Sequence, residues 1–192
     1  MAQSVLVHLV KVLSFDPSPV FSSSLQDPVL NGLRSSSEAV RISANTLFKE
    51  FAERSKEEEH VLKVVTEMAK QLTTGKISSP DHRGIFYECI GKTAAAKAEA
   101  VSVKALQALT AMTGKESNDA AVIFAIDATI LHLQVLLAAG KDVPEVATTV
   151  KAGVAALGSS RVSLRKTWSR GVGTLVWNCR FFFFFLLMLF AR

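Results

Sequence analysis

The chain of 192 residues is long enough for one ordinary domain or a short array of repeats, and too short for several independent domains. Apolar residues make up 49% and charged residues 20%, a balance that excludes bulk disorder. Its two cysteines, Cys89 and Cys179, lie far apart without CxxC spacing, which argues against a disulfide framework or a zinc site and fits a reducing compartment.

Charge is unevenly distributed along the chain, whose formal net charge is +5. Residues 1–150 hold 15 basic and all 17 acidic residues, whereas residues 151–192 hold seven basic residues and no acidic one. A basic end next to a nearly neutral body indicates an anionic partner such as RNA or a lipid surface. A solvated helix face followed by an unusual tail is the alternative interpretation.

Helical periodicity begins at the N-terminus, where residues 3–15 predict an apolar helix. This stretch has no basic n-region and no cleavage pattern, so it is not interpreted as a signal peptide. The DPSP sequence at 16–19 ends the helix, and a second helix is expected at about 27–34. A single apolar stripe over 37–55 predicts the third helix.

Helical patterns continue through the rest of the chain, with no strand pattern among them. The stretch KEEEHVLKVVTEMAKQLTTG at 56–75 opens with acidic residues, which favour a helix N-terminus. Further helices are expected at 81–96, 98–113, 118–139, 144–157 and 161–177. Glycines between these segments are interpreted as C-terminal caps: Gly75, Gly114, Gly140 and Gly158.

Two stretches of the chain resemble each other without a gap. They are GLRSSSEAVRISANTLFKEF at 32–51 and ALGSSRVSLRKTWSRGVGTL at 156–175. A fainter copy places Val103 and Lys104 at the position of the shared apolar–Arg pair. The aligned residues are Leu33, Ser35, Ser36, Val40 and Arg41 in the first copy and Leu157, Ser159, Ser160, Leu164 and Arg165 in the second.

Recurrence of a helix, a serine turn and a helix that opens on apolar–Arg predicts stacked helical pairs. Each pair leaves an apolar face that its neighbour must cover, and the arginine can bond turn carbonyls or an acidic group of the adjacent repeat. The sequence therefore predicts an all-α, HEAT-like α-solenoid of stacked antiparallel helical hairpins over residues 1–177.

Motifs that carry catalysis or bind cofactors are missing from the sequence. The IGKT stretch at 90–93 lacks the first glycine of a phosphate loop, because Phe86 stands at that position. The four histidines are scattered, and no serine or cysteine lies in a nucleophile-elbow context. We therefore expect no enzyme activity, no catalytic or metal-binding residue and no cofactor.

A basic cluster marks the helix at 161–177 and is the strongest candidate for a binding site: Arg161, Arg165, Lys166 and Arg170. These side chains share one side of the predicted helix, where they could contact RNA phosphates on a ribosome. A solvated or inter-repeat role is the competing interpretation. Trp168 and Trp177 of the same helix are core candidates, with base stacking as the alternative.

Several of these stretches resemble a known family. LNGLRSSSEAVRISANTLFKEFAERSKEEEHVLKVVTEMAKQL, VSVKALQAL and AALGSSRVSLRKTWSRGVGTLVW are similar to the amino-terminal half of the large HEAT-repeat translational activator of general amino acid control, the stalled-ribosome sensor. The most specific part is LRKTWSRGVGTLVW at 164–177. The resemblance covers roughly residues 24–177, a small slice of a very long protein.

The resemblance implies a non-enzymatic cytoplasmic scaffold that associates with ribosomes and recognises stalled ones. With an ATP-binding-cassette partner, this family activates the kinase of the initiation factor two alpha subunit during amino acid starvation. The regions that bind the kinase and the ATP-binding-cassette partner are expected outside this chain, and no DNA partner is expected. The alternative is an unrelated HEAT-type protein-interaction adaptor, tethered to a membrane through residues 171–191.

The chain ends in an apolar tail at 178–192 that includes five consecutive phenylalanines. The uninterrupted apolar run, 181–191, would span about 16 Å as a helix, against roughly 30 Å for a bilayer core. Extending the run back to Gly171 places Arg180 within the span, at a cost of about 2.5 to 3.5 kcal/mol. We expect instead that the chain departs from its family at about Asn178 and reads into an intron or a shifted frame.

Overall fold

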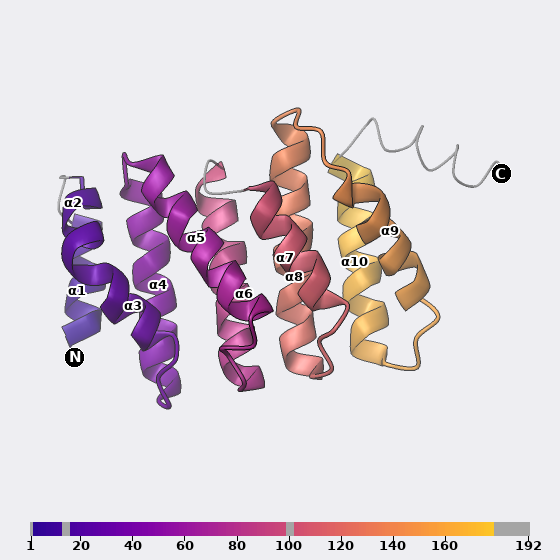
Figure 1. Cartoon of the computed structure of the whole chain (residues 1–192), viewed down its shortest axis with the longest axis horizontal. Helices are drawn as coiled ribbons and strands as arrows, with labels where there is room; N and C mark the ends of the chain where they lie inside the picture. Colours follow the sequence, from indigo (N-terminus) through magenta and orange to yellow (C-terminus); the bar gives the residue numbers. More distant parts are fainter. Residues whose placement is uncertain (1, 13–15, 99–101, 179–192) are drawn as a thin grey trace.

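The structure is a computed structural model that describes residues 2–12, 16–98 and 102–178. Its helices stack in two layers along one long axis, from the N-terminus at one end to α10 at the other (Figure 1). Layer A contains α3 (Gln26–Gly32), α5 (Glu58–Thr73), α7 (Val103–Thr113) and α9 (Glu145–Ala156). Layer B contains α1 (Ala2–Val12), α4 (Glu38–Arg54), α6 (Pro80–Ala96), α8 (Asp119–Ala138) and α10 (Val162–Asn178).

Successive helices form antiparallel hairpins, each with one helix in layer A and the next in layer B. The hairpins are α3–α4, α5–α6, α7–α8 and α9–α10, and in layer B each long helix packs on the next one along the array. The described residues contain helices and no strands. This confirms the predicted all-α, HEAT-like α-solenoid, which needs neighbour contacts because one hairpin cannot bury its own apolar face.

Turn chemistry sets the helix boundaries. Asn118 accepts hydrogen bonds through its side chain from the backbone nitrogens of Ala120 and Ala121, at 3.0 and 2.9 Å, and so starts α8. Gly75 and Gly140, after α5 and α8, have φ angles of 70° and 66°, as glycine caps do. The two other predicted glycine caps, Gly114 and Gly158, do not adopt positive φ, so their turns would accept other residues.

The largest departure from the predicted helices lies between residues 16 and 26. The sequence predicts no helix between the DPSP stretch and residue 27, but α2 (Ser18–Val20) and a π-helical turn, η1 (Phe21–Leu25), lead directly into α3. Phe21 is buried and stacks on Phe51 of α4, with ring centroids 3.6 Å apart. Pro19 lies in the first turn of this segment, where its missing N–H is tolerated, so the prolines start a helix rather than keeping the region open.

The core consists of two contiguous clusters. The first extends from α1 to residues of α7 and α8, and its largest buried side chains include Phe48, Met68 and Tyr87. The second joins α7 to α10 around Ile126 and other apolar residues of α8, and it includes Trp168 of α10. Trp168 is therefore a core residue, as the sequence predicts.

Helix α8 is the central element of the second cluster. Among the described residues it is long and apolar enough to cross a bilayer, but α6, α7 and α10 cover it in the array. His132 of α8 is fully buried, and its Nδ1 lies 3.0 Å from the carbonyl of Ala128. Burial lowers the pKa of His132 to about 4, because the charged imidazolium would lose its hydration.

The proposed membrane tether, 171–191, overlaps this array at its start. Gly171 and Leu175 are buried residues of α10, and a Cβ on Gly171 would lie 2.8 Å from Cγ1 of Ile130 in α8. These residues therefore belong to the repeat. Residues 179–192, which include most of the predicted apolar tail, lie outside the described part of the chain.

We predict that Gly171→Ala lowers the free energy of unfolding by about 1 to 3 kcal/mol, because α8 and α10 must separate to admit the methyl group. Gly173→Ala in the same helix is the control. Nothing lies within 4 Å of the Cβ it would add, so it should leave stability unchanged or raise it by up to about 1 kcal/mol. Urea unfolding followed by circular dichroism measures both; equal effects would contradict the close packing of α8 and α10.

Candidate functional site

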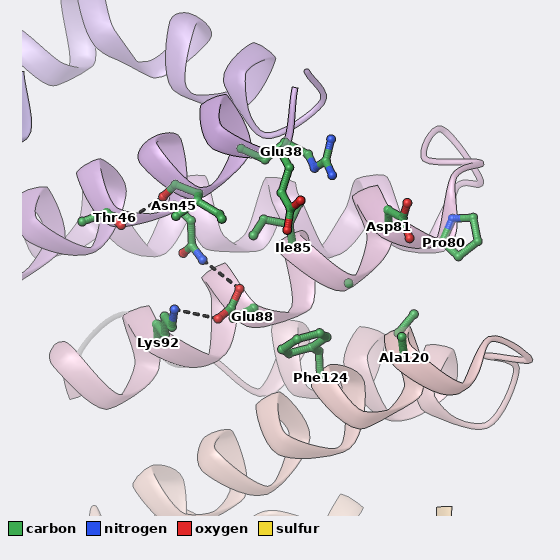
Figure 2. Close-up of a pocket in the computed structure, with 14 residues that line it drawn as sticks. Glu38, Asn45, Thr46, Pro80, Asp81, Ile85, Glu88, Lys92, Ala120 and Phe124 are labelled. Atoms are coloured by element: carbon green, nitrogen blue, oxygen red, sulfur yellow. Dashed lines mark hydrogen bonds and ion pairs between the residues drawn. The ribbon is translucent and has the colours of Figure 1, made fainter. Parts of the chain in front are cut away.

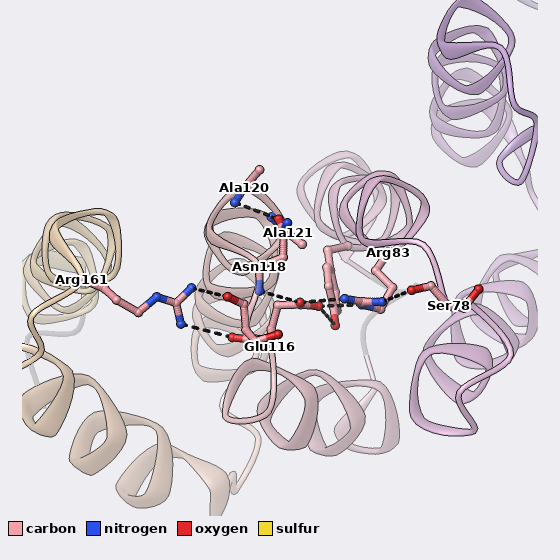
Figure 3. Close-up of polar contacts among 9 residues, drawn as sticks. Ser78, Arg83, Glu116, Asn118, Ala120, Ala121 and Arg161 are labelled. Atoms are coloured by element: carbon pink, nitrogen blue, oxygen red, sulfur yellow. Dashed lines mark hydrogen bonds and ion pairs between the residues drawn. The ribbon is translucent and has the colours of Figure 1, made fainter.

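Arg161, the first residue of the predicted basic cluster, lies just before α10 and reaches into the preceding hairpin. Its Nε donates to Oδ1 of Asp119 at 2.6 Å, and its Nη2 donates to the carbonyl of Ser117 at 3.1 Å. A longer contact of 3.4 Å joins its Nη1 to the carbonyl of Glu116 (Figure 3). The guanidinium of Arg161 therefore connects α10 to the α7–α8 turn.

Arg165, the second member, is bonded within its own hairpin. Its Nη1 donates to the carbonyl of Ser159 in the turn before α10. Arg41 occupies the equivalent position in α4, and its Nη1 donates to the carbonyls of Ser35 and Ser36 at 2.8 and 3.0 Å. At both positions the arginine satisfies turn carbonyls that would otherwise need water.

A third arginine, Arg83, stands at the same helical position in α6, and the sequence reasoning did not single it out. The signal is present, since SSPDHR at 78–83 matches SSEAVR at 36–41 in its serines and its arginine. Arg83 donates to the carbonyl of Ser78, as its counterparts do to theirs. By contrast, the pair aligned earlier, Val103 and Lys104, starts α7 in layer A, so that alignment is wrong.

Helix α8 has Val122 at the position of these arginines, so the carbonyls of the turn before it are bonded by a residue of another hairpin. The carbonyls of Glu116 and Ser117 in the α7–α8 turn receive the guanidinium of Arg161 from the next hairpin. In each of the four hairpins, the turn between the two helices therefore has an arginine guanidinium bonded to its carbonyls. In three hairpins this arginine belongs to the layer B helix that follows the turn, and in the α7–α8 hairpin it comes from the next hairpin.

The α7–α8 turn also holds the most buried ion pair of the described residues. Nε and Nη2 of Arg83 donate to the two carboxylate oxygens of Glu116, at 2.7 and 2.9 Å, and the Glu116 side chain is 1% exposed. The backbone nitrogen of Asn118 and the hydroxyl of Tyr87 also donate to this carboxylate, at 3.1 and 3.4 Å. Figure 3 shows Arg83 and Arg161 approaching the same turn from opposite sides.

Ionisation at this turn follows from these contacts. The hydrogen bond from Arg83 holds the pKa of Glu116 below its ordinary value, against the opposing effect of burial. The same bond raises the pKa of Arg83, and burial together with the negative charge of Glu116 raises the pKa of Tyr87. At neutral pH the turn therefore holds a carboxylate, a guanidinium and a neutral phenol.

The remaining two members of the cluster face solvent. Nη2 of Arg170 donates to both carboxylate oxygens of Asp127 in α8, at 2.7 and 2.8 Å, but the two side chains are 63% and 41% exposed. An exposed pair of this kind contributes about 0 to 1 kcal/mol, so Arg170 can exchange its partner. Lys166 is exposed and forms no hydrogen bond or ion pair with any described residue.

The other residues of the repeat signature differ in burial. Leu33 is fully buried, whereas Leu157, its counterpart in the second copy, is 44% exposed. Val40 and Leu164 are half-buried, and Trp168 packs on Gly153, where a Cβ would lie 2.8 Å from its ring. Trp177 lies in the last turn of α10, but its side chain is outside the described part of the structure.

No catalytic arrangement is present among the described residues. They contain no group of three or more His, Cys, Asp or Glu side chains that could hold a metal. Cys89 is buried and its thiol pKa is raised by burial, which disfavours the nucleophilic thiolate. The IGKT stretch lies inside α6, where Gly91 allows close packing on Ala128 rather than forming a phosphate loop.

Fold and site together define a helical-repeat protein of the HEAT type, in which several charged side chains connect neighbouring hairpins. A protein family described as general control nonderepressible 1 (Gcn1) N-terminal matches residues 80–181, more than half of the chain, from the start of α6 through α10. The chain belongs to this family, and the matched region is a non-catalytic part of a scaffold protein. Comparisons with curated proteins and with solved structures find no match.

We predict that Glu116→Gln lowers the free energy of unfolding at pH 7 by about 1.5 to 3 kcal/mol, because it leaves the half-buried Arg83 without a charged partner. The control, Asp127→Asn, removes the exposed partner of Arg170 and should cost at most about 1 kcal/mol. Urea unfolding measures both variants, and equal losses would show that the buried pair has no special role.

The same pair predicts a pH dependence. Because the pKa of Glu116 is lower in the folded state, its stabilisation is present above the ordinary glutamate value of 4.5 and is lost as the pH falls through the folded value. The difference in stability between the wild type and Glu116→Gln should therefore shrink below about pH 4.5. A constant difference down to pH 3 would contradict this ionisation.

Proposed function

We propose that this chain is a segment of a non-enzymatic, cytoplasmic HEAT-type scaffold that associates with ribosomes and takes part in the regulation of translation. Its family membership supports this proposal most strongly, because the family is that of the Gcn1 translational regulator. Solenoids of this kind bind large partners along their extended surfaces, which suits a ribosome. The proposed role of the scaffold is in the cellular response to amino acid starvation and to stalled ribosomes.

The exposed cations of α10 are the proposed ribosome contacts. Lys166 has no partner among the described residues, and Arg170 has only an exposed one, so both can approach RNA phosphates without loss of a buried bond. Arg161 and Arg165 donate to turn carbonyls and are assigned a supporting role. Phosphate contacts by lysine and arginine release counterions and make binding sensitive to salt.

Activation of a protein kinase is proposed for the longer family protein rather than for this segment alone. The translation-factor kinase and the ATP-binding-cassette partner are assigned to regions outside the repeats described. A HEAT-type adaptor that binds only proteins is the second candidate function. It gains support from the arginines of the repeats, most of which are engaged within the array.

The ribosome proposal predicts that Lys166→Gln weakens co-sedimentation of the full chain with purified ribosomes several-fold at low salt. It should also lower the slope of log affinity against log salt by about one, as expected for one phosphate contact. Lys151→Gln is the matched control, since Lys151 is exposed on α9 in layer A of the same hairpin. This control should bind like the wild type.

Two results would contradict the proposal. Equal losses for Lys166→Gln and Lys151→Gln would show that α10 is not the contacting surface. Failure of the folded wild-type chain to sediment with ribosomes at low salt would remove ribosome association and favour the protein-only adaptor.

The apolar tail is proposed to be foreign to the family from about Asn178 onward. The family match ends at residue 181, close to this point. Sequencing of transcripts across codons 178–180 should show that the tail codons are retained intron or a shifted frame. A transcript that joins these codons in frame to a further helical repeat would disprove the proposal that the tail is foreign to the family.

A further inference from the structure

A groove of about 460 Å³ lies on layer B between α4 and α6, and no residue of α10 lines it (Figure 2). The side chain of Phe124 from α8 forms its far wall. Its volume falls within the range of about 300 to 1,000 Å³ that ligand pockets occupy. The ribosome contacts proposed above make no use of this groove.

Apolar side chains from three successive helices line the groove. Ile42 of α4 and Phe124 of α8 are 52% and 37% exposed, and Ile85 of α6 is half-buried between them. The ring of Phe124 packs over Gly84 of α6, 3.4 Å from the position that a Cβ would take there, an ordinary van der Waals distance. Large apolar side chains gathered in an open groove indicate a surface that a partner covers.

A buried polar group lies among these apolar residues. Asn45 is 2% exposed, and its Nδ2 donates to Oε2 of Glu88 at 3.1 Å, while Oε1 of Glu88 accepts from Lys92 at 2.6 Å. The Oδ1 atom of Asn45 has no hydrogen-bond partner. Asn45 and Glu88 thus add a polar, hydrogen-bonded pair to the lining of the groove.

The free charges of the groove are negative. Glu38 and Asp81 stand at its edge, and neither forms a hydrogen bond or an ion pair with a described residue. The cations of the groove are already engaged, since Arg41 donates to Ser35 and Ser36 and Lys92 pairs with Glu88. The groove therefore attracts a cationic partner and repels a phosphate backbone.

We propose that this groove binds a segment of a partner protein in which a large apolar side chain lies next to lysine or arginine. The apolar side chain fills the space between Ile42, Ile85 and Phe124. The basic side chain pairs with Glu38 and Asp81.

The test is selection of a phage-displayed library of random 12-residue peptides on the immobilised full chain. Enriched peptides should combine a large apolar residue with an adjacent Lys or Arg. Fluorescence polarisation with one enriched peptide should then show at least a fivefold loss of affinity in Ile42→Ser and in the double variant Glu38→Gln/Asp81→Asn. Ile42 is exposed, so its substitution leaves the core intact.

Glu58→Gln/Glu59→Gln is the matched control, because these residues occupy the same first-turn positions in α5 of layer A as Glu38 and Asp81 occupy in layer B. It should retain wild-type affinity. An equal loss in this control, enrichment of acidic or uncharged peptides, or no enrichment would overturn the proposal. So would binding of a fluorescent single-stranded RNA that Ile42→Ser abolishes.

This proposal and ribosome association can fail separately. Lys166→Gln should bind the enriched peptide like the wild type, because Lys166 lies on α10 and does not line the groove. A loss of peptide binding in Lys166→Gln would place the peptide on the basic surface and overturn the groove as its site.

Discussion

The buried carboxylate of Glu116 is the constraint on which the middle of the array depends. It receives two hydrogen bonds from Arg83 of the preceding hairpin, and the carbonyls of its turn receive Arg161 from the following one. In a solenoid each repeat contacts only its neighbours, so the angle between hairpins is set locally. A turn bonded from both sides fixes the relative positions of α6, α8 and α10. These helices carry much of the proposed peptide groove and all of the proposed ribosome contacts.

The arginines of this chain hold the repeat array together at several of its turns. At a fixed position in α4, α6 and α10 an arginine satisfies the carbonyls of the turn before its own helix. Where α8 has Val122 instead, Arg161 of the next hairpin takes over the same carbonyls. Basic residues in a repeat array therefore cannot be counted as binding residues from their charge alone. Whether a basic residue can bind an external anion depends on the contacts it already makes within the array. Of the predicted cluster, Lys166 and Arg170 are the exposed members.

Much of the fold could be predicted from the sequence, because long amphipathic helices and their caps are local features. Four layer B helices, α4, α6, α8 and α10, begin and end within one residue of their predicted limits. The helical segment from Ser18 was missed, since it depends on Phe21 stacking on Phe51 far along the chain. Val103–Lys104 was misplaced because helices of both layers can start on the same apolar–basic pattern. The burial of Glu116 could not be predicted, because a glutamate in a turn is normally expected to face solvent. The groove could not be predicted either, because its side chains come from three helices.

A double-mutant cycle on Arg83 and Glu116 tests the central claim most directly. Unfolding free energies would be measured in urea for Arg83→Gln, Glu116→Gln, the double variant and the wild type at pH 7. If the pair connects neighbouring hairpins as described, the two losses are strongly non-additive, with a coupling of about 1.5 to 3 kcal/mol. Losses that add to within about 0.5 kcal/mol would show that the two side chains act independently and would contradict the account.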